Sequence, residues 1–472
     1  MSMIPSQSYS SRIGSILAIL LCIIVAFLAA ILQKHLKHTV AVVKKVERPV
    51  ELTAAEILGN LPVSAHQSDT DKAAMAIIAK VRAEPDKGYR WVALGDVLAQ
   101  KLRDTADQNY LHHAELAYLR ALKLDPKDSD AMTGMAWVMG NRHIFDQSTR
   151  WANEALTINS NQVAALGILG DAALELGEYD KAFDCYQKMS DCRPDLSSWS
   201  RGAYLLWLTG DDKKAIWLME KAISAGAPFG ENTAWCRAKL AMMYFHSGSL
   251  SAGWKSLEPA LTKGSRSPHV LLAACKLAAA NQDYPAAILY CDKLLEGGLN
   301  HEALVLKGDL SIAAGEPDQA LGCYQKVMDL HTAQEGKGAH DHMQMARFYA
   351  DHDRNLVDAL KMAEEHKLTH NVIEADTLAW VYFKNGNLSR ATETMRIALC
   401  QNTPDAEMRY HAGMIAAARG EKEAAKTYLK QAIAWNARFN VIQAPIARNT
   451  LDALIAADLS TAKTPVSTSQ KQ

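Results

Sequence analysis

The chain contains 472 residues and has a formal net charge of −1, from 51 basic and 52 acidic side chains. This balance excludes a strongly basic nucleic-acid binder and an acidic disordered protein. Hydrophobic residues make up 49% of the chain, enough to bury a core, and 14 prolines and 26 glycines are too few for a Pro/Gly-rich all-β or low-complexity protein.

The first predicted element is an apolar segment that follows a short N-terminal tail, residues 1–12. Ile13 to Leu32 is a run of 20 residues without a charge, and a helix of that length spans roughly 30 Å, the thickness of the hydrocarbon core of a bilayer. We therefore predict a transmembrane helix over 13–33 that anchors the protein in the membrane. The alternative is a cleaved signal peptide, whose apolar region would be ~7–15 residues and would end in a small-x-small site.

Flanking charges indicate how this segment is oriented. Arg12 is the one basic residue before it, whereas several follow. These are Lys34, Lys37, Lys44, Lys45 and Arg48. By the positive-inside rule we expect the C-terminal bulk in the cytoplasm, with the periplasm as the alternative. Residues 34–68 are interpreted as a juxtamembrane linker with one short helical stretch near 53–58.

An internal repeat occupies most of the remaining chain. Segments that start at Leu169, Lys307 and Ala412 share glycine, alanine and a large apolar residue at the same mutual spacings. Gly177 and Gly210, in equivalent places, are 33 residues apart. A period of this length predicts units of two short helices joined by a tight turn at the glycine.

This pattern resembles the tetratricopeptide repeat, a helix–turn–helix unit of 34 residues. The resemblance implies an all-α fold: a right-handed α-solenoid of about ten repeats, behind the single transmembrane helix, over residues 69–459 with its capping helices. Capping helices are expected at Asp71–Glu84 and Val441–Leu459, because an end repeat otherwise exposes its apolar face. Residues 460–472 are predicted to be disordered. The repeats are expected to begin near Gly88, Ser129, Val163, Leu196, Ala234, Pro268, His301, Ala339, Val372 and Ala406.

Not every repeat has the glycine at the turn. The second has no glycine there, and in the eighth the sequence Asp353-Arg-Asn takes its place. In the sixth repeat Cys275 and Cys291 occupy paired packing positions on the two helices. We expect these two side chains to be neighbours in the core, with a disulfide as the alternative if the repeats are exported.

The sequence contains none of the motifs that carry common chemistry. It has no phosphate-binding loop, no H-E-x-x-H, no G-x-S-x-G and no G-x-G-x-x-G after a strand. His366 and His370 are spaced to face one metal on a helix, but no cysteine or carboxylate completes the set. We therefore expect no catalytic residue, no cofactor, no metal and no enzymatic activity.

The first helices of stacked repeats line a concave surface, which in the tetratricopeptide family binds partner peptides. Large aromatic side chains occupy many of the family's groove-facing places here, and aromatic residues dominate binding energies. The partner-binding residues implied by the resemblance are Trp137, Tyr204, Trp207, Trp235, Phe245, Arg347, Trp380, Phe383 and Tyr410. The alternative is that some of them pack between repeats. Further charged candidates are Asp171, Arg201, Lys239, Lys276, Asp309 and Lys384.

The sequence therefore predicts a membrane-tethered scaffold that binds peptides or helices of other proteins in the groove. The alternative is an assembly or regulatory factor for an envelope polymer, lipopolysaccharide or exopolysaccharide. The N-terminal helix is expected to contact the membrane. Neither nucleic acid nor a small-molecule substrate is expected as a partner.

Overall fold

The computed structural model describes residues 53–59, 61, 68–105, 107–334, 342–365 and 370–462. The predicted transmembrane helix at 13–33 and most of the predicted linker lie outside these residues. Among the helices that the structure describes, none combines the length and the apolar character needed to cross a bilayer. The chain forms two compact units, Met1–Gly59 and Asn60–Gln472. The first contains α2 (Ala54–Gly59), in the place where the linker is predicted to be briefly helical.

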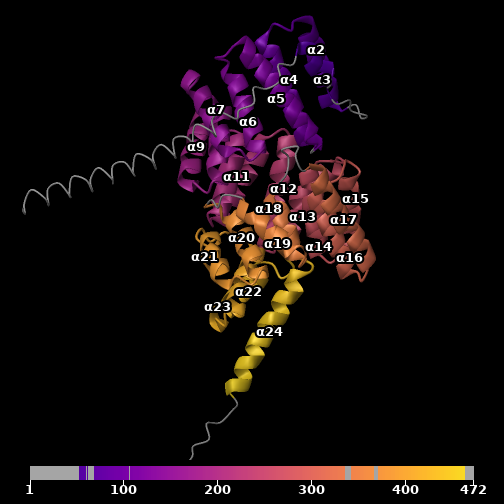
Figure 1. Ribbon diagram of the computed structural model, residues 1–472, viewed down its shortest axis with the longest axis vertical. Helices are drawn as coiled ribbons and strands as arrows, with labels where there is room; N and C mark the ends of the chain where they lie inside the picture. Colours follow the sequence, from indigo (N-terminus) through magenta and orange to yellow (C-terminus); the bar gives the residue numbers. More distant parts are fainter. Residues whose placement is uncertain are drawn as a thin grey trace, which may run out of the picture. The chain divides into compact units, whose positions relative to one another are not determined.

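The second unit consists of a leading helix, ten helix–turn–helix pairs and a closing helix, and its described residues contain no strand (Figure 1). The leading helix is α3 (Asp69–Ala83) and the closing helix is α24 (Gln443–Ala462). The pairs, called repeats 1 to 10 below, are α4–α5 (Gly88–Thr105, Asn109–Leu124), α6–α7 (Ser129–Asn141, Phe145–Ile158), α8–α9 (Val163–Glu175, Tyr179–Cys192), α10–α11 (Leu196–Leu208, Asp212–Ala225), α12–α13 (Glu231–His246, Leu250–Thr262), α14–α15 (Pro268–Ala280, Tyr284–Leu295), α16–α17 (His301–Ala313, Pro317–Gln334), α18–α19 (His342–Asp351, Leu356–Glu365), α20–α21 (Val372–Lys384, Leu388–Ala398) and α22–α23 (Ala406–Ala418, Lys422–Trp435).

Eight of the ten first helices begin at the predicted residue. Of the other two, α12 begins at Glu231 rather than near Ala234, and the start predicted near Ala339 lies outside the described residues, in which α18 is described from His342. The closing helix continues to Ala462, past the predicted end of the solenoid at 459. The repeat pattern is therefore a reliable guide to where each helix pair begins.

The turn inside each repeat requires a residue in the left-handed backbone region. Gly177 has φ +72° and Gly210 has φ +85°, a conformation that costs glycine little because it has no Cβ. In repeats 2, 6 and 8, which lack the glycine, His143 (φ 58°), Gln282 (φ 63°) and Asp353 (φ 51°) adopt this conformation instead. The geometry of the turn is thus kept where the sequence signature is lost.

The two helices of a repeat approach closely because a small residue faces a large one. A Cβ added at Gly170 would collide with the ring of Tyr186, and a Cβ added at Gly308 would collide with Tyr324. In repeat 6 the Sγ atoms of Cys275 and Cys291 lie 2.8 Å apart, and both side chains are buried. The predicted proximity of these cysteines is confirmed, and both are free thiols.

Repeats that are far apart in the sequence also touch, which the repeat pattern does not predict. In a solenoid each repeat normally contacts only its neighbours. Here the connection before α20 packs on the end of α8, the connection before α22 packs on the end of α10, and the connection before α24 packs on the ends of α12 and α14. We call this set of contacts the seam. It joins repeats 3 and 4 to the connections before repeats 9 and 10, and it joins repeats 5 and 6 to the connection after repeat 10. Repeats 3 to 10 thus surround an interior.

Candidate functional site

The interior contains a cavity of about 700 Å³. It is lined mainly by first helices, those of repeats 3 to 10, and by the connection that follows α23. The sequence predicts a concave surface made by the same helices. The structure differs in that connections from the later repeats of the chain itself pack on the ends of the earlier first helices.

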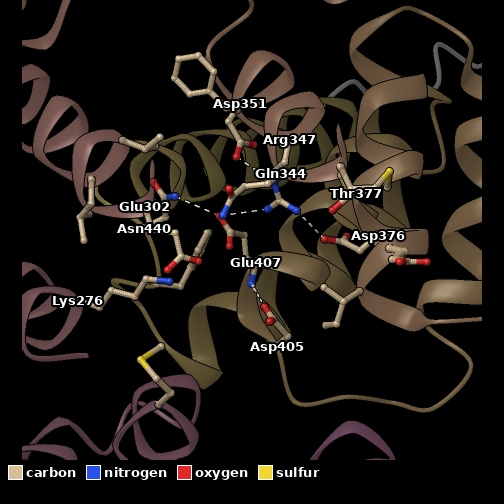
Figure 2. A pocket seen from close by; sticks show the side chains of 18 of the residues that line it. Lys276, Glu302, Gln344, Arg347, Asp351, Asp376, Thr377, Asp405, Glu407 and Asn440 are labelled. Carbon is tan, nitrogen blue, oxygen red and sulfur yellow. Dashed lines mark hydrogen bonds and ion pairs between the residues drawn. The ribbon is translucent and has the colours of Figure 1, made fainter. Parts of the chain in front are cut away.

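The lining is rich in charge (Figure 2). Among the described residues it has nine carboxylates, which are Glu175, Glu302, Asp309, Asp351, Glu365, Glu374, Asp376, Asp405 and Glu407. Its permanently charged bases are Lys276, Arg347 and Arg438. With neutral histidines the lining therefore has an excess of negative charge, although the whole chain has a net charge of only −1.

Arg347 of α18 is the centre of this charge cluster. Its Nε lies 2.9 Å from Asp351 Oδ2, its Nη1 lies 3.0 Å from Asp376 Oδ2, and its Nη2 lies 3.3 Å from Glu407 Oε1. The three carboxylates come from α18, α20 and α22, so one guanidinium links three successive repeats. Because arginine has five donors in a fixed planar arrangement, it can bind several carboxylates at once.

His411 completes the cluster from α22, where it is fully buried. Its Nδ1 lies 2.8 Å from Asp376 Oδ1 and its Nε2 lies 3.3 Å from Arg347 Nη2. Arginine can only donate a hydrogen bond, so Nε2 accepts and Nδ1–H donates to Asp376. The ring also stacks on Trp380 at a centroid distance of 4.1 Å, which fixes its orientation.

The pKa values of Asp376 and Glu407 in this cluster are shifted in opposite directions. Burial alone would raise the pKa of Asp376, but the charges and hydrogen bonds of His411 and Arg347 hold that pKa below its usual value of 3.8. Burial raises the pKa of Glu407 above 4.5, and the negative charge of Asp351 adds to this rise while Arg347 opposes it. One guanidinium therefore does not neutralise all the carboxylates around it.

The other charged residues predicted for the groove are mostly paired within the chain. Arg201 binds Asp171, with Nε 2.9 Å from Oδ1 and Nη2 2.9 Å from Oδ2. Asp309 accepts hydrogen bonds from His352 and from the hydroxyl of Tyr324. Lys384 Nζ forms an ion pair with Asp353 at 2.6 Å. Lys239 Nζ lies 5.0 Å from the ring centroid of Tyr204, in a cation–π contact.

The predicted partner-binding residues fall into three groups. Tyr204, Phe245 and Arg347 line the cavity. Trp207, Trp380 and Tyr410 are buried in its wall, where Trp207 is 6% exposed and the other two are 2% exposed. The half-buried remainder has partners on the protein: Trp137 lies under Arg103, Trp235 lies beside Lys239, and Phe383 stacks on Trp380. Whether any of the nine binds a partner stays a prediction.

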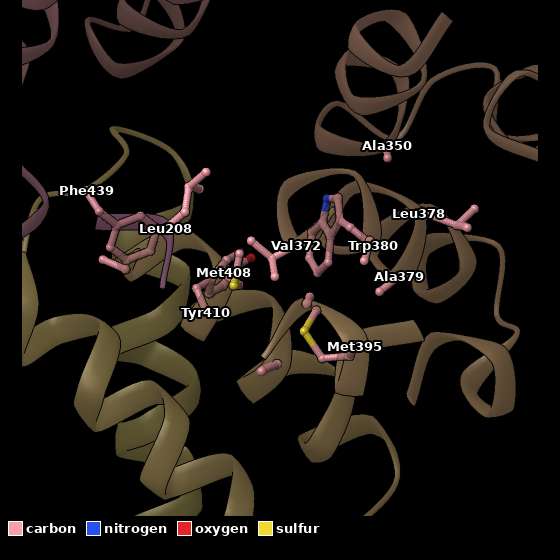
Figure 3. Close-up of a cluster of buried hydrophobic side chains, with 14 of the residues drawn as sticks. Leu208, Ala350, Val372, Leu378, Ala379, Trp380, Met395, Met408, Tyr410 and Phe439 are labelled. Atoms are coloured by element: carbon pink, nitrogen blue, oxygen red, sulfur yellow. The ribbon is translucent and has the colours of Figure 1, made fainter. Parts of the chain in front are cut away.

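The buried aromatic residues belong to one large apolar cluster that includes both sides of the seam (Figure 3). Leu208 comes from α10, Val372 and Trp380 come from α20, and Tyr410 comes from α22. Phe439, in the connection before α24, belongs to the same cluster. Because distant repeats pack on these helices, aromatic residues that were predicted to face an open groove are buried in the core instead.

Sequence reasoning missed the residues that close the cavity. Asn371, Thr403 and Asn436 are buried polar residues in the connections between repeats. These connections carry no repeat signature, and the three residues stand at different distances before the helices that follow them. Within the described residues no group of three or more His, Cys, Asp or Glu side chains is placed to hold a metal. His366 lies outside those residues, so the possible pair with His370 is untested.

Comparisons with known proteins match the fold. Family models described as tetratricopeptide repeats match residues 377–438 and 163–191. A curated relative, the subunit NrfG of the formate-dependent nitrite reductase complex of Escherichia coli O157:H7, is 27% identical over 130 residues. That alignment covers 27% of this chain and 62% of the relative, so the chain spans less than two thirds of the relative's length.

Solved structures are also similar. PilW, a widely conserved type IV pilus biogenesis factor, aligns with 15% identity and a TM-score of 0.37, over 43% of this chain and 92% of PilW. A tetratricopeptide repeat protein of Thermus thermophilus aligns with 17% identity and a TM-score of 0.34, over 44% of this chain and 99% of its own. Both family matches, together with ten helix pairs of the expected period and small-to-large packing in the described residues, lead to one conclusion: the chain contains tetratricopeptide repeats.

Proposed function

We propose that this protein is a membrane-tethered interaction scaffold that holds a basic segment of a partner protein in the cavity. The observation that carries the proposal is the composition of the lining, nine carboxylates against three permanent bases among the described residues. A protein-interaction role is the general role of this fold, and the curated relative is named as a subunit of a complex. Nothing in the lining calls for catalysis, so the proposal is a scaffold rather than an enzyme.

The size of the cavity limits what it admits. About 700 Å³ falls within the range of small-ligand pockets, roughly 300–1,000 Å³. This volume suits a few residues in extended or helical form, not a folded domain. Aromatic and aliphatic side chains of the lining, such as Tyr204, Phe245 and Val305, would contact the stems of lysine or arginine while the carboxylates bind their charged ends.

The charge of the lining favours a scaffold for a protein partner over the alternative function, a factor for envelope-polymer assembly. An excess of carboxylates attracts cationic groups and repels anionic ones, more strongly inside a protein than in water. Glu302, on the first turn of α16, is an exposed carboxylate of the lining. Anionic envelope polymers would face this repulsion, so we favour a protein partner over lipopolysaccharide or an acidic exopolysaccharide.

The membrane anchor in this proposal is supported by the sequence alone. The uncharged run from Ile13 to Leu32 is long enough to cross a bilayer, and the basic residues after it favour a cytoplasmic location for the repeats. A scaffold fixed at the membrane would raise the local concentration of its partner there. Labelling of introduced cysteines from each side of the membrane tests both the anchor and its orientation.

Peptide binding tests the central claim. We would titrate the purified chain with two peptides of equal length, one rich in lysine and arginine and one rich in glutamate and aspartate, and follow tryptophan fluorescence. The basic peptide should bind, with an affinity that falls as salt rises. Equal binding of both peptides, or of neither, would overturn the proposal.

A matched pair of variants locates the binding. Glu302→Lys reverses a charge of the lining, whereas Glu316→Lys makes the same change at an exposed residue of the turn after α16. The first variant should weaken the basic peptide several-fold and the second should leave its affinity unchanged. Equal losses in both would place the binding outside the cavity.

A further inference from the structure

The junction between repeats 7 and 8 is built differently from the others. In every other pair of consecutive repeats the second helix of one packs on the first helix of the next, as α15 packs on α16 and α19 on α20. Among the helices as far as the structure describes them, α17 and α18 scarcely contact each other. Individual side chains make this junction instead. The ring centroid of Phe348 lies 5.6 Å from that of Tyr324 and 6.0 Å from that of His301.

His352, in the turn after α18, makes a polar contact across the same junction. Its Nε2 lies 2.8 Å from Asp309 Oδ1 of α16, and its Nδ1 lies 2.7 Å from the carbonyl oxygen of Phe348. Asp309 Oδ1 also accepts a hydrogen bond from the hydroxyl of Tyr324, at 2.7 Å. Both ring nitrogens therefore face acceptors. A neutral imidazole has only one N–H, so these two contacts require a ring with both nitrogens protonated.

The additional proton belongs to the ring rather than to the carboxyl group, because a carboxyl group is ordinarily a much stronger acid than an imidazolium. Burial alone would lower the pKa of His352, but the hydrogen bond to Asp309 and its charge raise that pKa above the usual 6.5, with smaller contributions from the Phe348 carbonyl and Asp351. The side chains of His352 and Asp309 are 7% and 10% exposed, so solvent screens this pair little.

The other charged and titratable groups around this junction have partners of their own. They are Arg347 of α18 on Asp351, Lys384 of α20 on Asp353, Arg354 over the ring of Tyr324, and His301 of α16 beside the ring of Phe348. The cations among them therefore bind groups other than Asp309. His352 is the group across the junction whose charge can change near neutral pH.

The same arrangement occurs between repeats 3 and 4, with arginine in place of histidine. Tyr186 donates to Asp171 at 2.8 Å, and Arg201 of the next repeat binds the same carboxylate. In both junctions the aspartate and the tyrosine are 15 residues apart in the chain. Arginine stays charged throughout the pH range of proteins, whereas histidine does not. One chain thus contains two versions of this contact, and only the later one can lose its cation.

We propose that the junction between repeats 7 and 8 is a proton-dependent joint, closed by the imidazolium of His352 and loosened when this ring loses its proton. A neutral ring keeps its bond to Phe348 within its own repeat, and the lone pair of Nε2 then faces the carboxylate of Asp309. Repulsion separates these two groups, while Tyr324 stays with Asp309 in repeat 7.

The joint also belongs to the wall of the cavity. Asp309, Phe348 and Asp351 line the cavity, so loosening the joint changes the surface that a ligand would meet. The inference rests on the proposed function for its biological meaning, a binding site regulated by pH. The joint itself is measurable without any partner.

The charge of the ring can be measured in the unsubstituted protein. Nitrogen NMR of a sample with ¹⁵N-labelled histidine distinguishes an imidazolium from a neutral ring, and the signal of His352 is the one that His352→Gln removes. At pH 7.0 a histidine with the ordinary pKa is about threefold more often neutral than charged. His352 should be mainly an imidazolium at this pH, and a mainly neutral ring would overturn the proposal.

A distance between repeats 7 and 8 measures the loosening. Leu321 of α17 and Val357 of α19 are exposed, so spin labels are attached to Leu321→Cys and Val357→Cys. The exposed Cys192 and Cys400, together with Cys22, are replaced by serine. Pulsed electron paramagnetic resonance should give a narrow distance distribution at pH 6.0 and a broader one at pH 8.5. Identical distributions at the two pH values would overturn the joint.

Two asparagine variants give the matched comparison. In Asp309→Asn the amide can donate to a neutral His352, so the joint no longer needs the proton and the distribution should stay narrow at both pH values. Asp171→Asn makes the same change in the contact with Arg201 and should leave the pH response intact. A response that persists in Asp309→Asn would contradict the role of this pair.

The outcome for the joint is separable from that for the proposed function. If Asp309→Asn does not fold, the NMR measurement on the unsubstituted protein decides whether the ring carries the proton. If the joint responds to pH but the basic peptide does not bind, the joint stands and the proposed function fails. If the peptide binds and neither the ring charge nor the distance behaves as expected, the proposed function stands and the joint fails.

Discussion

Arg201 and Arg347 both lie on first helices, α10 and α18, yet their surroundings differ. Arg201 binds both oxygens of one carboxylate, Asp171 of the preceding repeat, and those two side chains are 28% and 43% exposed. Arg347 shares its donors among Asp351, Asp376 and Glu407 from three repeats and is 20% exposed. The first is a satisfied pair between neighbours. The second is a cluster with more negative than positive charge, placed where a cationic ligand would bind.

The comparison predicts its largest effect at Asp376. Asp376→Ala removes the partner of both Arg347 and His411, and Asp376 is only 5% exposed. The change leaves the buried Nδ1–H of His411 without its acceptor and leaves Arg347 with Asp351 and Glu407 alone. A buried donor without a partner costs about 1–3 kcal/mol, and one donor of each residue loses its partner here. Urea unfolding followed by circular dichroism measures the loss.

The same change in the exposed pair serves as its control. Asp171→Ala removes the partner of Arg201, but solvent screens the remaining charge, so the loss should be about 1–2 kcal/mol. Equal losses at the two positions would show that the cluster around Arg347 is no more important for stability than an ordinary ion pair.

The two arginines can also be compared by removing each one and measuring how the free energy of unfolding depends on pH. Arg347→Met leaves three carboxylates together without their cation, which raises their pKa values in the folded state. A carboxyl group with a raised folded pKa stabilises the protein most at low pH, and this contribution is lost as pH rises from the unfolded value toward the folded one. The unfolding free energy of Arg347→Met should therefore fall steeply between about pH 4 and 7.

Arg201→Met leaves only one carboxylate, Asp171, which also accepts a hydrogen bond from Tyr186. Its pH dependence should be much weaker. Parallel pH profiles of the two arginine variants would contradict the assignment of excess negative charge to the Arg347 cluster.

The smallest expected effect on stability is at Glu407. A substitution there distinguishes its contribution from that of Asp376, because the pKa values of the two residues are shifted in opposite directions. The raised pKa of Glu407 means that its charged form is disfavoured in the folded protein, so its contribution to stability declines as pH rises above 4.5. Asp376 has a lowered pKa, so its contribution is present above 3.8 and is lost as pH falls. Glu407→Gln should match the wild type in acid and be slightly more stable at neutral pH. A lower stability at neutral pH would contradict the direction of the shift.

The sequence was sufficient to predict the local architecture. The left-handed turns at Gly315 and Gly386, and the pairing of small with large residues, depend on the backbone and on contacts within one repeat or between neighbours. Such contacts recur about every 34 residues and leave a periodic signal. The helix starts, the turns and the position of the closing helix follow from that signal.

The closure of the cavity could not be predicted in this way. Whether Thr403 meets Leu208 depends on the curvature of the whole superhelix, the sum of many small rotations between repeats. The residues involved sit in connections with no periodic signal. Aromatic residues predicted for an open groove, such as Trp380, are therefore found in the packed wall, while the carboxylates around Arg347 acquire their excess charge only when three repeats come together.

The seam also has a consequence for the order of folding. Its hydrogen bonds join residues that are 196, 195 and 191 positions apart in the chain, whereas the contacts within a repeat are local. Contacts of high sequence separation form slowly, because the intervening chain must be ordered before they are made. During synthesis the first eight repeats can fold as each leaves the ribosome, but the capping of α8 must wait until Asn371 has emerged. The repeats thus form one after another during synthesis, whereas the few hydrogen bonds of the seam form together at the end.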